Sequence, residues 1–256
     1  MSRVSRGFDV DAAHAHLRKR DRALSTWLRK VETIDAHARW KQRFDTTDAL
    51  ARAILFQQLS GKAASTIVGR VEIAIQSKLL HAEAFARADD LALRGCGVSG
   101  NKLLALRDLS ARAQRGEIPG TAQMARMQDD EIIAALSAVR GIGAWTVQMM
   151  LMFRLGRPDV LPVDDLGIRK GAQIVDGLDA MPTPKELVAR GEVWGPYRTL
   201  AGMYLWRIAD LAKPVVVKPA ATKSAATKSA ATKRTTVAKK GAVAKKPAKP
   251  SPRSQG

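Results

Sequence analysis

The sequence contains a single cysteine, Cys96, in 256 residues. One cysteine excludes a disulfide framework and any iron–sulfur or zinc site built from four cysteines, and it fits a reducing compartment. Long apolar runs are also missing, because no stretch reaches the roughly 18 residues that cross a membrane. The first residues lack the apolar core of a secretory signal. We therefore expect a cytoplasmic protein with no membrane partner.

Acidic residues are missing from residues 213–256, which hold 12 Lys and Arg. The whole chain has 43 basic and 24 acidic residues, a net charge of +19. The remainder of the chain therefore keeps 31 basic and 24 acidic residues, a net charge of +7. A moderately basic body with a strongly basic tail favours a polyanionic partner.

This tail is also poor in groups that could build a core. It repeats AATKS with a five-residue period and has no aromatic residue, so it cannot bury enough apolar surface to fold. It resembles the tail of a linker histone. We predict a helical body over residues 1–212 and a disordered tail over 213–256 that binds DNA phosphates through counterion release. A solubilising low-complexity tail is the alternative.

The body has apolar residues at helical spacing nearly throughout, and it has no strand pattern with Asn-Gly or Asp-Gly hairpins. The predicted fold class is therefore all-α. In the predicted helix over 102–115, Leu104 is expected to be buried with its neighbouring leucines. Helices are expected over 9–31 with a break near Arg20, after a cap at Thr46-Thr47-Asp48, over 61–75 after Ser60, over 102–115 after Ser99, over 128–139 and 142–154, after a capping box at Thr183–Glu186, and over 196–211.

A pair of glycines, Gly141 and Gly143, stands between two of these helices in LSAVRGIGAWTVQMMLMF, residues 136–153. No Gly-Lys-Ser/Thr follows, which excludes a Walker loop, and a dinucleotide fingerprint would need a strand and a third glycine. A glycine hairpin that opens a helix exposes N–H groups at a positive dipole end and suits a phosphate. This pattern is typical of a helix-hairpin-helix element, which grips a DNA phosphate without reading a base. An ordinary helix–helix turn is the alternative.

Two adjacent aspartates, Asp164 and Asp165, follow in LPVDDLGIRKG, at the expected start of a helix that contains Ile168 and Ile174. One capping aspartate is enough to start a helix, so the second is spare. The order of glycine hairpin, helix, proline-containing loop and aspartate at a helix start is more specific than any of its parts.

Five motifs occur in order within residues 21–210: ILFQQLSGKAASTI, GCGVSGNKLLALRDLS, LSAVRGIGAWTVQMM, LPVDDLGIRKG and GEVWGPYRTLAGMYLWRIAD. Together they resemble the helix-hairpin-helix DNA glycosylase superfamily, and within it the alkylbase branch, the 3-methyladenine DNA glycosylase II family. The resemblance implies two interleaved helical subdomains, with the first and last helices in one of them. It also implies a monomeric repair enzyme of the nucleoid, or of the nucleus in a eukaryote, that flips and excises alkylated purines from damaged double-stranded DNA.

The resemblance assigns roles to the hairpin and to the aspartates. Asp165 would be the catalytic carboxylate, with Asp164 as its neighbour or as the helix cap. The amides of Gly141, Gly143 and Trp145 would hold the phosphate on the 3′ side of the lesion.

The resemblance also implies a structural monovalent cation at the hairpin. Its carbonyls, those of Val139 and Ile142, would hold a structural Na⁺ or K⁺. No cofactor is required.

The base pocket that the resemblance implies contains Trp145, Met149, Tyr204 and Trp206. Their rings would attract a cationic base through cation–π contact, although core packing is the alternative for the aromatic residues. Met149 stands where some relatives have tyrosine, which makes the pocket less aromatic.

The gap left by an extruded base would be filled from the loop after the first motif's helix. Gln58 and Leu59 are the wedge candidates, or they simply end that helix. Lys62 and Lys102 are candidates for phosphate contacts, although a solvated lysine is the commoner case.

The position two residues after Gly143 decides the type of chemistry. Bifunctional members of the superfamily carry a lysine there that forms a Schiff base with the sugar, whereas this chain has Trp145. We therefore predict a monofunctional glycosylase. Two alternatives stay open: a non-enzymatic helix-hairpin-helix DNA-binding protein in which Asp165 only caps a helix, and a glycosylase for another damaged base.

Deletion of residues 213–256 should weaken binding to duplex DNA at low salt and flatten the dependence of affinity on salt. The reason is that each lysine or arginine that leaves the phosphates no longer releases a counterion, and the slope changes by about 0.9 per lost contact. Fluorescence anisotropy across a salt series measures both. A full-length variant with the tail lysines and arginines changed to glutamine should match the deletion. Equal slopes for all three proteins would contradict a DNA-binding tail.

Overall fold

The computed structural model describes residues 6–35 and 40–212. The chain divides into two units, Met1–Pro214 and Val215–Gly256, and every described residue lies in the first. The predicted tail thus lies outside the described residues. Of the helices that are described, none has the length and apolar character needed to span a membrane.

All regular elements in the described part of the chain are helices, which confirms the predicted fold class. The break near Arg20 is also confirmed, because Asp21 separates two helices there. Three short helices, α6, α7 and α9, were not predicted. The elements are α1 (Val10–Arg20), α2 (Arg22–Leu28), α4 (Thr46–Phe56), α5 (Gly61–Ala74), α6 (Ala82–Arg87), α7 (Asp90–Gly95), α8 (Gly100–Gln114), α9 (Thr121–Met124), α10 (Asp129–Ser137), α11 (Ala144–Met150), the π-helix η1 (Leu151–Leu155), α12 (Leu166–Asp176), α13 (Pro184–Gly191), the 3₁₀ helix η2 (Glu192–Trp194) and α14 (Arg198–Leu211).

Side-chain caps explain where most of these helices begin. Ser60 caps α5, Ser99 caps α8, and Thr183 starts a capping box in α13, each as predicted. Such a side chain satisfies an N–H group of the first turn, which has no partner within the helix. The predicted cap of α4 is wrong, because Asp45 accepts the hydrogen bond in place of Thr46-Thr47-Asp48.

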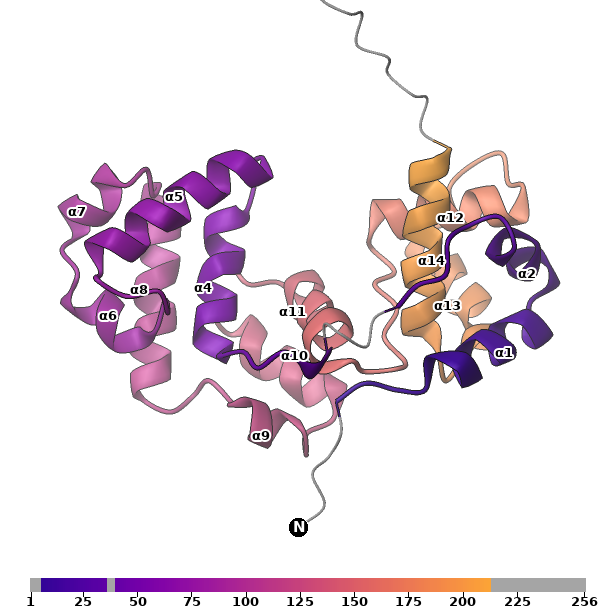
Figure 1. Cartoon of the computed structure of the whole chain (residues 1–256), viewed down its shortest axis with the longest axis horizontal. Coiled ribbons are helices and arrows are strands. Elements are labelled where there is room, and N and C mark those ends of the chain that lie inside the picture. Colours follow the sequence, from indigo (N-terminus) through magenta and orange to yellow (C-terminus); the bar gives the residue numbers. More distant parts are fainter. Residues whose placement is uncertain (1–5, 36–39, 213–256) are drawn as a thin grey trace, which may run out of the picture. The chain divides into compact units, whose positions relative to one another are not determined.

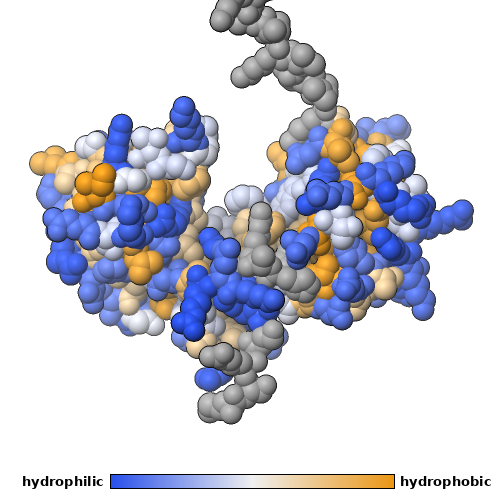
Figure 2. Space-filling model, viewed as in Figure 1, coloured by the Kyte–Doolittle hydropathy of each residue, from blue (hydrophilic) through white to orange (hydrophobic). Residues whose placement is uncertain are grey.

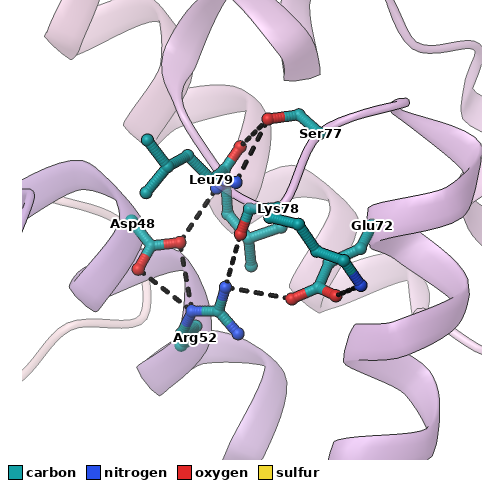
Figure 3. A network of polar contacts seen from close by, with 7 residues as sticks. Asp48, Arg52, Glu72, Ser77, Lys78 and Leu79 are labelled. Carbon is teal, nitrogen blue, oxygen red and sulfur yellow. Dashed lines mark hydrogen bonds and ion pairs between the residues drawn. The ribbon is translucent and has the colours of Figure 1, made fainter.

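Asp48 serves instead in a polar network that joins α4 to α5 and to the loop after α5 (Figure 3). Arg52 donates to Asp48 at 3.0 Å, to Glu72 at 3.0 Å and to the Lys78 carbonyl oxygen at 2.8 Å. Lys78 pairs with Glu72 at 2.9 Å, and Asp48 accepts from the Leu80 amide at 2.9 Å. The network fixes α4 against its neighbours, and with it the loop that follows α4.

The helices pack in two groups within the first unit (Figure 1). In one group α12 packs on α14, α2 and α13, and α1 packs on α14. In the other, α8 packs on α4, α6 and α7, and α5 packs on α4 and α7, while α10 packs on α11. The first and last helices therefore share a group, although most of the body separates them in the sequence.

One cluster of buried apolar side chains includes residues from both groups. In α8, Leu103, Leu106 and Leu109 belong to it, but Leu104 is 51% exposed. The prediction for Leu104 is wrong because this position faces away from the stripe that the other three leucines form. Figure 2 shows one face of the molecule, on which hydrophilic residues predominate and hydrophobic residues form smaller patches.

The contact between α12 and α14 depends on glycine. A Cβ at Gly171 would lie 2.6 Å from the carbonyl carbon of Leu205 and closer still to its oxygen. One turn earlier, a Cβ at Gly167 would lie 2.7 Å from Cδ1 of Trp206. The missing side chains let the two backbones approach, and this brings Asp165, which precedes α12, beside Trp206.

Gly171→Ala should lower the free energy of unfolding by about 1–3 kcal/mol, because the added methyl forces the two helices apart. Gly69→Ala in α5 is the matched control, since a Cβ there meets nothing within 4 Å. This control should raise stability by up to ~1 kcal/mol through helix propensity. Urea denaturation measures both values. A Gly171→Ala protein as stable as the control would contradict the close approach.

Candidate active site

The glycine hairpin joins α10 to α11 and turns at Gly141. Gly141 has φ +77°, a left-handed conformation that glycine adopts without strain. Gly143 is the N-cap of α11. Ile142 between them is buried, and its N–H donates to the Val139 carbonyl at 3.0 Å. The isoleucine thus anchors the hairpin in the core and leaves the glycine backbone at the surface.

The hairpin amides are available to a ligand. The N–H groups of Gly141, Gly143 and Trp145 donate to no acceptor in the part of the chain that the structure describes. Unpaired N–H groups at the positive end of a helix dipole form a site for an anion such as phosphate. The three amides assigned to the DNA phosphate are therefore brought together.

The helix after the hairpin differs from the predicted one over 142–154. It starts at Ala144, because Gly143 has an extended backbone, and it changes into the π-helix η1 at Leu151. A π-helix has more residues per turn than an α-helix, so it shifts the side chains that follow it. Phe153 and Arg154 lie in this segment.

The predicted cation at the hairpin would be held by backbone carbonyl oxygens, each of which has two lone pairs. The Val139 carbonyl already accepts from the Ile142 amide. Among the described residues, no group of three or more His, Cys, Asp and Glu could hold a metal ion, so an ion at the hairpin would depend on carbonyl oxygens. Na⁺ or K⁺ at Val139 and Ile142 stays a prediction.

The carboxylate of Asp165 receives hydrogen bonds from three elements. Its Oδ1 accepts from the Ile168 amide of α12 at 2.9 Å and from the indole N–H of Trp206 in α14 at 2.7 Å. Its Oδ2 accepts from the indole N–H of Trp145 in α11 at 2.8 Å. The side chain is half-buried. Three donors hold the carboxylate in one orientation, because bonds to a charged acceptor are stronger than neutral ones.

The neighbouring Asp164 has a different environment. It is exposed, and the cap of α12 is Asp165 alone. The alternative in which Asp164 caps the helix is wrong. Asp165 therefore serves as the cap while Trp145 and Trp206 also hold it.

A cavity of about 630 Å³ lies between α4 and the segment formed by α11 and η1. Trp145 and Met149, both predicted for the base pocket, line it. Phe56 and Phe153 line it as well, and sequence reasoning missed both. Phe56 could have been found from the sequence, because it is a large aromatic residue outside the apolar stripe of α4. In the structure its side chain is 41% exposed. The lining residues are Ala49, Arg52, Ala53, Phe56, Gln57, Gln58, Trp145, Thr146, Met149, Met150, Phe153 and Arg154.

Trp206 lies behind this cavity and not on its wall. Its ring stacks on Phe153, with centroids 5.8 Å apart and planes at 23°. It also lines a second hollow together with Gly167 and Lys170. Trp206 therefore supports the Phe153 ring and orients Asp165.

Tyr204 does not belong to the pocket, which corrects its predicted role. It is 1% exposed, and its hydroxyl accepts from the Ile34 amide at 3.1 Å and lies 3.1 Å from Nε2 of His14. Burial raises the pKa of Tyr204 above its ordinary value. The residue joins α14 to α1 and to the segment after α2, so the core-packing alternative holds for it.

The wedge candidates follow α4 in an unusual turn. Gln58 has φ +56°, a left-handed conformation that is uncommon outside glycine. Gln58 and Leu59 are both exposed, and Gln58 lines the cavity. Their positions agree with the wedge assignment, which stays a prediction.

Lys102 is not simply solvated, because its amine has partners within the protein. Its Nζ donates to the carbonyl oxygens of Leu55 and Gln57 at 2.8 and 2.9 Å, and burial lowers the pKa of its amine. It therefore caps the end of α4 with two of the three N–H donors of a part-buried ammonium group, and its phosphate contact stays a prediction. The phosphate contact of Lys62 stays a prediction.

A glycine hairpin between two helices, followed by an aspartate cap near an aromatic cavity, is the arrangement that the resemblance to helix-hairpin-helix DNA glycosylases implies. The chain belongs to the HhH-GPD superfamily of base excision DNA repair proteins, whose family model matches residues 51–196.

Similar proteins carry related names. DNA-3-methyladenine glycosylase 1 of Schizosaccharomyces pombe is 34% identical over 195 residues, which cover 74% of this chain and 86% of that protein. The structure of the 3-methyladenine DNA glycosylase of that organism in complex with abasic DNA has a TM-score of 0.69 at 33% identity, covering 78% of this chain and 98% of that one. A DNA-3-methyladenine glycosidase structure from Bacillus halodurans has a TM-score of 0.70 at 33% identity, covering 79% and 91%.

Trp206→Phe should lower the free energy of unfolding by about 1–3 kcal/mol, because it leaves a ring against Phe153 but removes a donor to a carboxylate. Trp27→Phe is the control, because Trp27 is a partly buried tryptophan of α2 whose indole N–H donates no hydrogen bond to a described residue. Chemical denaturation of both proteins provides the comparison. Equal stability changes would mean that the indole–carboxylate bond contributes nothing.

Proposed function

We propose that this protein is a monofunctional DNA glycosylase that extrudes alkylated purines of the 3-methyladenine and 7-methylguanine type from duplex DNA and hydrolyses their glycosidic bond. The observation that carries the proposal is the Asp165 carboxylate, held by Trp145 and Trp206 next to an aromatic cavity and to the free amides of the hairpin. The similarity to proteins named 3-methyladenine glycosylases supports the substrate class.

The chemistry of an alkylated purine suits this site. Alkylation puts positive charge on the ring, and the base leaves as a neutral molecule, so little general-acid help is needed. The sugar develops positive charge at the same time. A fixed carboxylate such as Asp165 stabilises that charge and orients the attacking water.

The cavity provides the favourable contacts that hold the extruded base. A cationic base against the faces of Trp145, Phe56 or Phe153 gains about 0.5–2 kcal/mol for each favourable cation–π contact. Extrusion from the stack costs a few kcal/mol, so contacts of this kind, together with a wedge at Gln58 or Leu59, offset most of that cost. The cavity volume of about 630 Å³ also leaves room for a larger adduct.

The tryptophan at position 145 limits the reaction to hydrolysis. An indole nitrogen cannot form a Schiff base with the sugar aldehyde, whereas an amine at this position could. Trp145 is instead committed to Asp165 by its N–H. The product is therefore an intact strand with an abasic site, made by a monomer on damaged duplex DNA.

The two alternatives predict different behaviour. A protein that only binds DNA has no need of a cavity beside a fixed carboxylate, and the cavity favours an enzyme. A glycosylase for another damaged base would share Asp165, so the identity of the released base decides between them.

Asp165→Asn should reduce release of 3-methyladenine or 7-methylguanine from methylated duplex DNA at least about 100-fold, with DNA binding kept. Asparagine caps helices well, so the fold should persist while the negative charge is lost. Asp164→Asn, at the exposed neighbour, is the matched control and should keep wild-type activity. Chromatography of the released bases measures the rates.

Two results would overturn this proposal. Absence of base release from methylated DNA by the wild-type protein would overturn the proposal and leave the two alternatives, DNA binding alone or release of another damaged base. Covalent trapping of the protein on DNA with borohydride would contradict hydrolysis without a Schiff base.

A further inference from the structure

The turn after α4 is tied to the hairpin by a side chain that no role described above uses. Nε2 of Gln57 donates to the Gly141 carbonyl oxygen at 2.7 Å. Gln57 and Gly141 are far apart in the sequence, but each is next to a group with a proposed role: Gln57 precedes the wedge candidate Gln58, and Gly141 carries a hairpin amide. The hydrogen bond therefore joins the part that would enter the DNA stack to the part that would hold its phosphate.

One face of α8 supports both partners of this bond. Lys102 holds the carbonyls at the end of α4, as described above. Asp108, six residues further, accepts from the Arg140 amide at 2.8 Å. Ala105 lies between them, and its Cβ is 3.6 Å from the place a Cβ on Gly141 would take. Residues three apart on a helix share a face, so α8 supports the turn and the hairpin along one line.

The turn needs such support because its backbone is strained. Gln57 leaves the helix with an extended backbone, and Gln58 follows at φ +56°. A non-glycine residue in this region persists only where its surroundings fix it. The last carbonyls of α4 would otherwise have no partner within the helix, and Lys102 satisfies two carbonyls there. Loss of Lys102 or Gln57 would let the turn relax while α4 itself remains packed.

We propose that Gln57 and Lys102 are positioning residues that set the distance between the inserting turn and the phosphate-holding hairpin. The proposal rests on the proposed function, because it assumes that a base leaves the stack. A wedge helps only if it reaches the gap while the hairpin holds the same strand, and small misplacements cost large factors in rate. Gln57 lines the cavity, but its Nε2 is engaged with the Gly141 carbonyl oxygen, and the Lys102 amine donates to the carbonyl oxygens of Leu55 and Gln57, so both act on the base through the turn and the hairpin.

The test compares variants that remove a donor but keep the shape. Gln57→Met and Lys102→Met lose the hydrogen bonds and keep length and packing, and Lys102→Arg restores a cationic donor. Gln123→Met, at an exposed residue of α9, is the control for the glutamine change. Thermal unfolding followed by circular dichroism first establishes that each variant is folded.

Two readouts then separate positioning from general damage. The first is the single-turnover rate of base release from methylated DNA, in duplex and in single-stranded form. The second is the fluorescence of 2-aminopurine beside a tetrahydrofuran abasic analogue in a duplex, which rises when the neighbouring stack is opened. Gln57→Met loses one hydrogen bond and Lys102→Met loses two, so both variants should release base from the duplex at least about tenfold more slowly. They should match wild type on single strands and give a smaller 2-aminopurine signal at saturation.

Lys102→Arg should recover most of the duplex rate, and Gln123→Met should behave as wild type. Equal losses on single and double strands, or an unchanged 2-aminopurine signal in both Met variants, would overturn the positioning role. The fluorescence arm needs no base release. If the wild-type protein released no base, the proposed function would fail while the coupling of turn and hairpin would still be decided.

Discussion

The hydrogen bonds to the Asp165 carboxylate are the constraint on which the rest of the site depends. They join the start of α12 to Trp145 of α11 and Trp206 of α14, three segments that the chain sequence keeps apart. The glycines of α12 make this meeting feasible, because any side chain at Gly171 would push α14 away. A catalytic carboxylate has to be fixed before the reaction begins, since the orientation of charge ahead of time is what lowers the barrier.

Three groups around this carboxylate suit three different parts of a nucleotide. The amides of Gly141 and Gly143 suit a phosphate, the aromatic cavity suits a flat cationic ring, and the carboxylate suits a sugar that becomes positive. The same two tryptophans that orient Asp165 are connected to the cavity, Trp145 by lining it and Trp206 by stacking on Phe153. Binding of the base and stabilisation of the sugar therefore depend on the same rings, and the supports behind the hairpin and the turn come from α8.

Much of this arrangement could be predicted from the sequence, because it follows from local chemistry. The glycine hairpin and the Asp165 cap have short-range signals, and the resemblance gave Trp145 its place. Tyr204 was misplaced because α14 is buried nearly all round, from Thr199 to Leu205, so periodicity could not tell which face meets the site. Phe153 was missed, because the shift of a π-helix cannot be seen in apolar spacing.

Contacts between residues distant in the sequence could not be predicted from it either. No pattern near Lys102 indicates that its amine reaches the end of α4, and no pattern near Asp48 indicates that it is drawn into a network with Leu80. That network left Asp45 as the cap of α4.

The most direct test of the central claim, that the fixed Asp165 carboxylate stabilises a positively charged sugar, compares binding to duplexes with a cationic pyrrolidine or a neutral tetrahydrofuran in place of the abasic sugar. The wild-type protein should bind the cationic duplex about 100-fold more tightly, and Asp165→Asn should lose most of that preference. Equal affinities for the two duplexes, or a preference that survives Asp165→Asn, would contradict the account.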